Sequence, residues 1–175
     1  MPGHLLSLGK PMNKHLQQVR AFHDSFGIAQ PEEGDSGHVS DMDIVLRQAL
    51  LLDCASETFK AIAAGDLEKI LAGLVDLAFN ALAAIATRGD DVVAVAANWR
   101  QDGSVLSVVR VLSDKVNQCA SGETVHYSGL YAICAHLAQR FVNADFDQAF
   151  QILQHHLLSG RGDSVRIDLS PALFE

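Results

Sequence analysis

LRQALLLDCASETFKAIAAGDLEKILAGLVDLAFNALAAIATRG, residues 46–89, is the stretch that decides the fold. Apolar residues recur through it at the three- and four-residue spacings of a helical face, interrupted by a turn signal at Gly65-Asp66. Gly65 suits the end of one helix, and Asp66 suits the cap of the next. Since this turn is short, the two helices should pack antiparallel as a hairpin over residues 41–88, which Ser40 caps at its start.

Polar side chains interrupt these apolar helices at a helical spacing. Asp53 and Glu57 are four residues apart, so both carboxylates lie on one face of the first helix. Asp76 and Asn80 repeat this spacing on the second helix. An antiparallel pair can therefore bring three carboxylates and an amide oxygen into one pocket, and such oxygen ligands suit Mg²⁺.

The same residues also have a purely structural interpretation. Asp76 can pair with an arginine such as Arg47 or Arg88, while Asp53 and Glu57 lie on a solvated edge. Spacing alone favours this interpretation, because polar pairs at i and i+4 are common on helices. Against it, a buried carboxylate is costly without a cation beside it, and Asp76 lies in the most apolar part of the hairpin.

A wider pattern contains this hairpin. Val19-Arg-Ala-Phe-His-Asp-Ser-Phe-Gly27 is followed by a Pro/Glu loop and then by the hairpin, with Ala64-Gly-Asp-Leu67 and Gly73-Leu-Val-Asp-Leu-Ala-Phe79. In order and spacing, residues 15–92 resemble the all-α nucleoside triphosphate pyrophosphohydrolases, the superfamily of MazG and the dimeric dUTPases. The resemblance implies a MazG-like helical bundle. It also implies a hydrolase that uses Mg²⁺, or Mn²⁺ in its place, to release pyrophosphate and a nucleoside monophosphate.

The resemblance assigns roles to particular residues of this chain. The implied metal ligands are Asp53, Glu57, Asp76 and, in support, Asn80. Glu57 is also the implied catalytic residue that orients the attacking water, and Lys60 and His23 are the implied substrate-binding residues. For His23 an alternative stands beside this role, because a lone histidine near aromatic residues is more often a packed core group.

Two positions depart from the family's acidic motifs. Cys54 stands where the first motif has its second acid, and Gly73 stands where the second motif begins with an acid. Two hypotheses therefore follow from the resemblance. One is the Mg²⁺-dependent pyrophosphohydrolase, with reduced activity; the other is a catalytically inactive member that serves nucleotide sensing or oligomeric assembly.

The remainder of the chain is helical in pattern. The sequence RVLSDKVNQCASG is similar to RQALLLDCASE, which suggests that residues 104–142 form a degenerate second copy of the hairpin. We expect one all-α domain at 15–158, between a flexible N-terminal tail at 1–14 and a C-terminal tail at 159–175. Beyond the hairpin, helices are predicted at 13–26, at 90–98 behind an Asp90-Asp91 cap, and at 104–119, 124–142 and 145–158.

Composition limits the partners. The formal charge is −8 and no basic run occurs, so nucleic acid is not an expected partner. The three cysteines lack a metal-binding spacing and suit reduced thiols of a cytosolic protein. We find neither a signal-peptide pattern nor an uninterrupted apolar run of membrane length, and expect a cytoplasmic protein without a membrane partner. The resemblance adds a nucleoside triphosphate as substrate and a homodimer or higher homo-oligomer as the assembly.

Overall fold

The computed structural model describes residues 11–35, 37–100, 102, 104–160 and 167–174. Within these residues the secondary structure consists of six α-helices and two short 3₁₀ helices without a strand, which confirms the all-α class. The MazG-like detail stays a prediction. Residues 1–10 of the expected N-terminal tail lie outside the described part of the chain.

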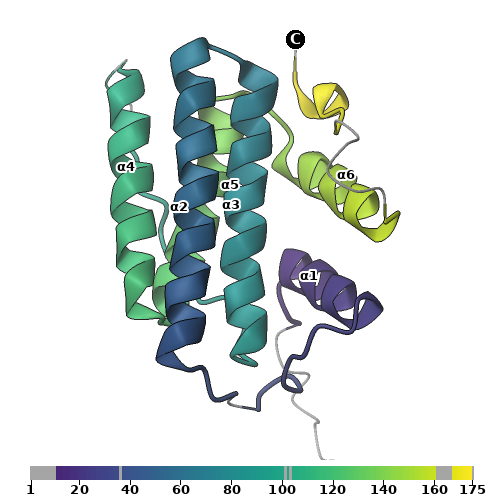
Figure 1. Cartoon of the computed structure of the whole chain (residues 1–175). Helices are drawn as coiled ribbons and strands as arrows, with labels where there is room; N and C mark the ends of the chain where they lie inside the picture. The colour runs from purple at the N-terminus through teal and green to yellow at the C-terminus, as the bar shows by residue number, and fades with distance from the viewer. Residues whose placement is uncertain (1–10, 36, 101, 103, 161–166, 175) are drawn as a thin grey trace, which may run out of the picture.

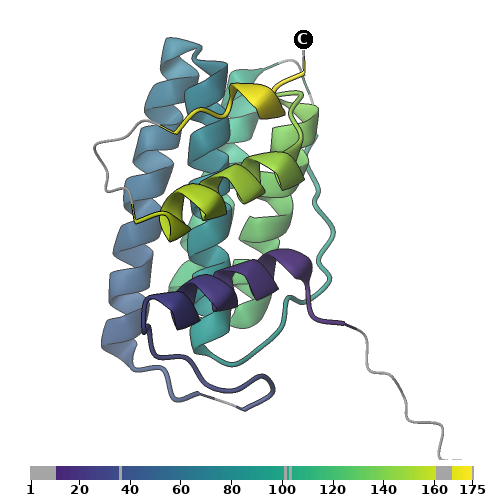
Figure 2. The same ribbon diagram turned by 90° about the vertical axis from the view of Figure 1, so that its right-hand side faces the viewer.

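The helices α2, α3, α4 and α5 run side by side, and α1 and α6 cross them on one flank (Figures 1 and 2). The long helix α3 is central, because it packs against α5 and α2 and also against the two crossing helices, α1 and α6. The 3₁₀ helix η1 (Cys119–Ser121) joins α4 to α5, and η2 (Ser170–Ala172) packs on α6. The helices are α1 (Lys14–Ser25), α2 (Asp41–Ala64), α3 (Leu67–Thr87), α4 (Val105–Gln118), α5 (Thr124–Arg140) and α6 (Phe146–Leu158).

The α2–α3 hairpin has the local signals that the sequence predicted. Ser40 and Asp43 form a reciprocal capping box at the start of α2. Gly65 ends the helix with φ +68°, a left-handed conformation that glycine adopts without strain. The carboxylate of Asp66 accepts a hydrogen bond from the backbone N–H of Lys69 and so caps α3. Both helices of the predicted hairpin are thereby confirmed.

The two helices of the hairpin approach closely at Gly73. A Cβ placed on this glycine would overlap the hydroxyl of Thr58 on α2. Thr58 is fully buried, and its hydroxyl donates to the carbonyl oxygen of Cys54 at 2.8 Å. The absence of a side chain at Gly73 therefore sets the spacing of α2 and α3 beside the acidic residues.

α3 also carries much of the hydrophobic core. By length and composition alone it qualifies as a membrane-spanning helix, although Asp76 and Asn80 interrupt its apolar run. In the fold, 72% of its most apolar window is buried inside the bundle. Packing by its neighbouring helices thus accounts for its apolar composition.

A buried histidine ties α1 to the helices around it. His15 lies within hydrogen-bond distance of the Tyr131 hydroxyl, 2.6 Å from Nδ1, and of the Asp147 carboxylate, 2.9 Å from Nε2. Burial lowers the pKa of His15 more than the hydrogen bond to Asp147 raises it. The neutral imidazole is therefore the form that the fold favours.

The prediction of a short helix at 90–98 is wrong. This segment runs alongside α5 without helical structure, and the Val93 amide donates to the hydroxyl of Ser128 at 3.0 Å. The Asp91 carboxylate accepts from the amides of Val92 and Asn13, so it does not cap a helix of its own. The Val93 amide thus donates to a distant side chain on α5 and not to a backbone carbonyl within a local helix.

Part of the expected C-terminal tail is packed. Leu169 and Ala172 are buried, and the Ala172 carbonyl accepts a hydrogen bond from the amide of Asp145 at 2.8 Å. Residues 167–174 therefore pack back onto the start of α6 within the same chain.

Candidate functional site

A cavity of about 920 Å³ lies between α2 and α3 on the side of the hairpin turn. We call it the acidic cavity. The side chains that give it its chemistry are Asp53, Cys54 and Glu57 of α2, Lys60 one turn further along, and Lys69 and Asp76 of α3. The helical spacing predicted this arrangement for the three carboxylates, and the structure places all three on one cavity.

Asp76 is the half-buried acid of this cavity. Its carboxylate makes no hydrogen bond or ion pair with any residue that the structure describes. Burial raises its pKa from the ordinary 3.8 to about 6, because the apolar surroundings of α3 disfavour the charged form. An unpaired carboxylate in such a position is a common feature of functional sites.

The structural alternative, in which Asp76 pairs with Arg47 or Arg88, is not found in the structure. Arg88 lies at the far end of α3, where it bonds to Asp90, Thr124 and the carbonyl oxygen of Gly122. Arg47 lies near the start of α2, outside the acidic cavity. Neither guanidinium neutralises Asp76.

Asp53 and Glu57 are exposed, as the structural interpretation predicted, while both also line the acidic cavity. Glu57 accepts a hydrogen bond from Lys60 at 3.0 Å, and both of these side chains reach into solvent. This ion pair is therefore weak, and each partner can exchange it for a ligand at little cost.

Two of the predicted site residues lie elsewhere. The Asn80 amide nitrogen donates to the Asp76 carbonyl oxygen at 2.9 Å and contacts the Cys54 sulfur at 3.5 Å, so Asn80 does not line the cavity. His23 is buried, and its Nδ1 lies 3.0 Å from the side-chain oxygen of Gln30. This agrees with the packed-histidine alternative, and burial lowers the His23 pKa.

The carboxylate oxygens that line the acidic cavity are of the type that binds a hard cation such as Mg²⁺. Across the described residues, no three His, Cys, Asp or Glu side chains lie close enough to one another to bind a single ion. Mg²⁺, however, usually takes one or two protein carboxylates and completes its shell with water and substrate phosphates. Asp76, which has no partner among the described residues, fits this role, with Asp53 or Glu57 as a second carboxylate.

Lys69 is a cavity residue that the sequence reasoning missed. It precedes Asp76 by seven residues on α3, and such a separation returns to the same side of a helix. Its Nζ atom is 3.9 Å from Asp66, in an exposed and weak pair. Helical periodicity, which places Asp53 and Glu57 on one face of α2, also places Lys69 and Asp76 on one face of α3, so it could have identified Lys69.

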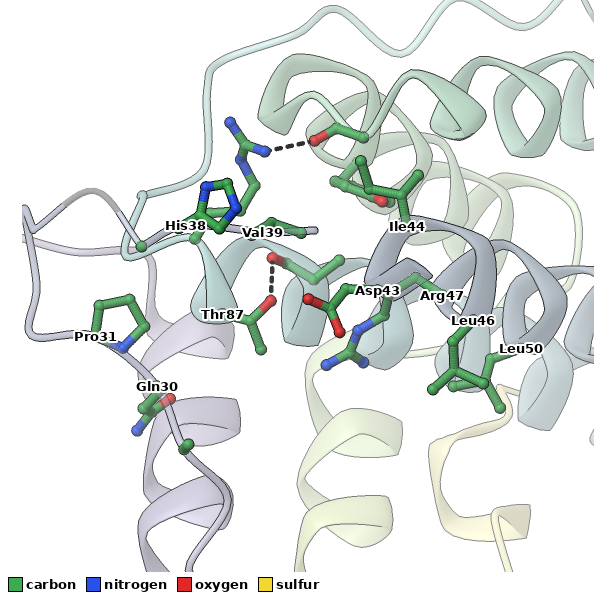
Figure 3. A pocket seen from close by; sticks show the side chains of 16 residues that line it. Gln30, Pro31, His38, Val39, Asp43, Ile44, Leu46, Arg47, Leu50 and Thr87 are labelled. Atoms are coloured by element: carbon green, nitrogen blue, oxygen red, sulfur yellow. Dashed lines mark hydrogen bonds between the residues drawn. The ribbon is translucent and has the colours of Figure 1, made fainter. Parts of the chain in front are cut away.

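A second cavity of about 640 Å³ lies at the other end of the hairpin (Figure 3). We call it the Arg47 cavity. Arg47, Leu46 and Leu50 project from the first half of α2, and Pro31 and His38 come from the segment before it. It shares no lining residue with the acidic cavity. The sequence signal for it is a single arginine between the apolar positions of early α2.

Comparison of the chain with protein-family models, curated proteins and solved structures finds no match.

Proposed function

We propose that the chain is a Mg²⁺-dependent nucleoside triphosphate pyrophosphohydrolase that releases pyrophosphate and a nucleoside monophosphate. The observation that carries the proposal is Asp76, a half-buried carboxylate without a described partner that faces a cavity with two further acids. This cavity has a size that suits a ligand of a few hundred daltons.

The charges of the acidic cavity match the two parts of a metal–triphosphate complex. Asp76, together with Asp53 or Glu57, would hold Mg²⁺. The ammonium groups of Lys60 and Lys69 lie on the same cavity and are held only by exposed ion pairs, so they are free to meet phosphate oxygens. When bound, the metal would neutralise phosphate charge and lower the pKa of water.

The residues of the chain supply positioning and proton acceptance. Glu57 is the catalytic residue in this proposal, because its exposed carboxylate can accept a hydrogen bond from a water molecule in the cavity. Asp76, with a pKa of about 6 in the absence of metal, is mostly ionised at neutral pH and is therefore available to hold the cation. Close packing at Gly73 fixes the α3 backbone against α2 beside both acids.

One observation favours the second hypothesis, an inactive helical protein that assembles with other chains. The outer face of α2 exposes large apolar side chains, among them Met42 with 72%, Leu46 with 62% and Leu52 with 55% of its surface accessible. A helix whose exposed side is this apolar is typical of a surface that meets another protein. Assembly and catalysis are compatible, so the test must address turnover itself.

Pyrophosphate release tests the proposal directly. The substrates are a panel of standard and modified nucleoside triphosphates, with Mg²⁺ and with a chelator. We expect metal-dependent turnover by the wild type, and its loss in Glu57→Gln and in Asp76→Asn. Asp114→Asn is the matched control, because Asp114 is an exposed acid on α4 that does not line the cavity.

Turnover that survives Asp76→Asn would contradict the assigned site. The enzyme proposal fails as a whole if no triphosphate in the panel is hydrolysed and Mg²⁺ leaves the thermal midpoint of the wild type unchanged.

A further inference from the structure

The Arg47 cavity has apolar walls with a positive group set into them. Leu46 and Leu50 lie on the α2 side, and Pro31 lines the cavity from the preceding segment (Figure 3). The aromatic side chain of Tyr127 from α5 lines the same cavity and is 2% exposed. A concave, mostly apolar site with a few polar groups is the usual form of a small-molecule site.

Two hydrogen-bond donors of this cavity are unused. Neither the guanidinium of Arg47 nor the hydroxyl of Tyr127 makes a hydrogen bond or ion pair with any residue in the described ranges. Arg47 is half-buried, and this burial lowers its pKa. A desolvated guanidinium without a partner is costly, so an anion that pairs with Arg47 would recover the lost interaction.

The other charged groups of the cavity are already engaged. Arg88 donates to the Gly122 carbonyl at 2.8 Å and to Asp90 and Thr124. The Asp43 carboxylate accepts from both the amide and the hydroxyl of Ser40, at 3.1 and 2.8 Å, in the capping box of α2. Asp43 forms no ion pair with Arg47 in the structure. Asp43 still attracts the charge of Arg47, but it is the one carboxylate among the lining residues and stands against two arginines, Arg47 and Arg88. The formal charge of the lining is therefore positive, in a chain whose net charge is −8.

We propose that the Arg47 cavity binds a small organic anion, with its phosphate or carboxylate group on Arg47 and Tyr127 and its apolar part against Leu46 and Leu50. A planar guanidinium suits both head groups, because it donates two parallel hydrogen bonds. The site is separate from the proposed hydrolysis, since it needs neither the metal nor the residues of the acidic cavity.

Phenyl phosphate and benzoate are the anionic probes, and benzyl alcohol is the neutral probe of similar shape. Each is titrated into the full-length protein without metal, and backbone amide shifts in NMR spectra report both affinity and place. We expect saturable shifts for at least one anionic probe, centred on residues 37–50, and none for benzyl alcohol at equal concentration. Inorganic phosphate should bind at least tenfold more weakly than phenyl phosphate.

Variants separate the proposed contacts from general charge. Arg47→Gln should weaken binding of the anionic probe at least tenfold, and Tyr127→Phe a few-fold. Arg110→Gln is the matched control, because Arg110 is an exposed arginine on α4 outside the cavity, and it should leave affinity within twofold of the wild type. Arg47→Lys keeps the charge and should retain part of the affinity.

Equal affinity in Arg47→Gln and wild type would overturn the proposal, as would shifts centred on the acidic cavity. If Arg47→Gln does not fold, the wild type decides: benzyl alcohol that binds as tightly as phenyl phosphate excludes an anion site. Because no nucleotide or metal is present, a failed hydrolysis assay and a failed binding assay are independent results.

Discussion

Replacing Asp76 with asparagine removes the charge from a half-buried carboxyl group while keeping its shape. In the folded protein the pKa of this group is about 6, against 3.8 without the fold. Between these two pH values the Asp76 carboxyl group binds more protons in the folded state than in the unfolded state. The contribution of Asp76 to stability therefore falls as the pH rises through this range. Asp76→Asn escapes this loss, so the variant should be more stable than the wild type at neutral and alkaline pH.

The size of the gain follows from the two pKa values. Their separation corresponds to about 3 kcal/mol at about pH 8, where the carboxylate is ionised in both states. The same relation gives roughly 1.6 kcal/mol at about pH 5 and roughly 0.6 kcal/mol at about pH 4. These are upper bounds, because the cavity admits some water to the carboxylate.

Urea unfolding followed by circular dichroism measures the difference, in the presence of a chelator at each of the three pH values. Asp53→Asn is the control, since Asp53 is exposed on the same cavity and should change stability by less than about 0.5 kcal/mol. Mg²⁺ should raise the thermal midpoint of the wild type and not that of Asp76→Asn.

An Asp76→Asn protein that is less stable than the wild type at about pH 8 would refute this reasoning. So would a gain that does not shrink as the pH falls. Either result would show that the Asp76 carboxylate has a favourable partner in the fold, and Asp76 would then not be free to bind a metal.

Three further predictions follow from other parts of the fold. Gly73→Ala should lower the free energy of unfolding, measured by urea denaturation, by about 1–3 kcal/mol, because the new methyl group overlaps Thr58. Gly129→Ala is the control: its added Cβ meets no atom closer than 3.7 Å, so it should be neutral or stabilising. Equal effects of the two glycine variants would contradict the close approach of α2 and α3. The His15 pKa is lowered below 6.5, so at this group the unfolded state binds more protons below that pH. The contribution of His15 to stability should therefore fall as the pH drops below about 6.5, which is opposite in sign to the contribution of Asp76. The stability of the wild type relative to His15→Gln should fall with it; a difference that does not change with pH would exclude His15 as the titrating group. Burial and the neighbouring acids raise the pKa of the Cys54 thiol to about 11. Iodoacetamide at about pH 8 should therefore label Cys54 at least tenfold more slowly in the native protein than in urea, as measured by peptide mass spectrometry. Equal labelling rates would show an exposed thiolate.

Local sequence signals predicted the α2–α3 hairpin well. The capping box at Ser40, the left-handed Gly65 and the Asp66 cap act within a few residues of each other, so the sequence contains all that is needed to place these helix ends. The shared cavity of Asp53 and Asp76 followed in the same way from helical spacing and a short turn.

What the sequence could not predict depended on distant partners. The sequence of residues 90–98 has the pattern of a capped helix, but in the fold the Val93 amide donates its hydrogen bond to Ser128 of α5. The amide of Asn80 was expected to face the metal, but the nearest acceptor for its nitrogen is the carbonyl of Asp76 on its own helix. The role of Arg47 appears only once Tyr127, which is distant in the chain, is placed beside it.

The central position of α3 has a consequence for how the chain is made. On a ribosome, α3 emerges before α5, the helix against which it packs most extensively. Until α5 has been translated, a segment as apolar as a membrane span has only α2 and α1 to cover it. Synthesis that stops after α4 therefore leaves the apolar surface of α3 that α5 covers exposed to solvent and prone to aggregation, whereas α5 buries this surface once it has been made.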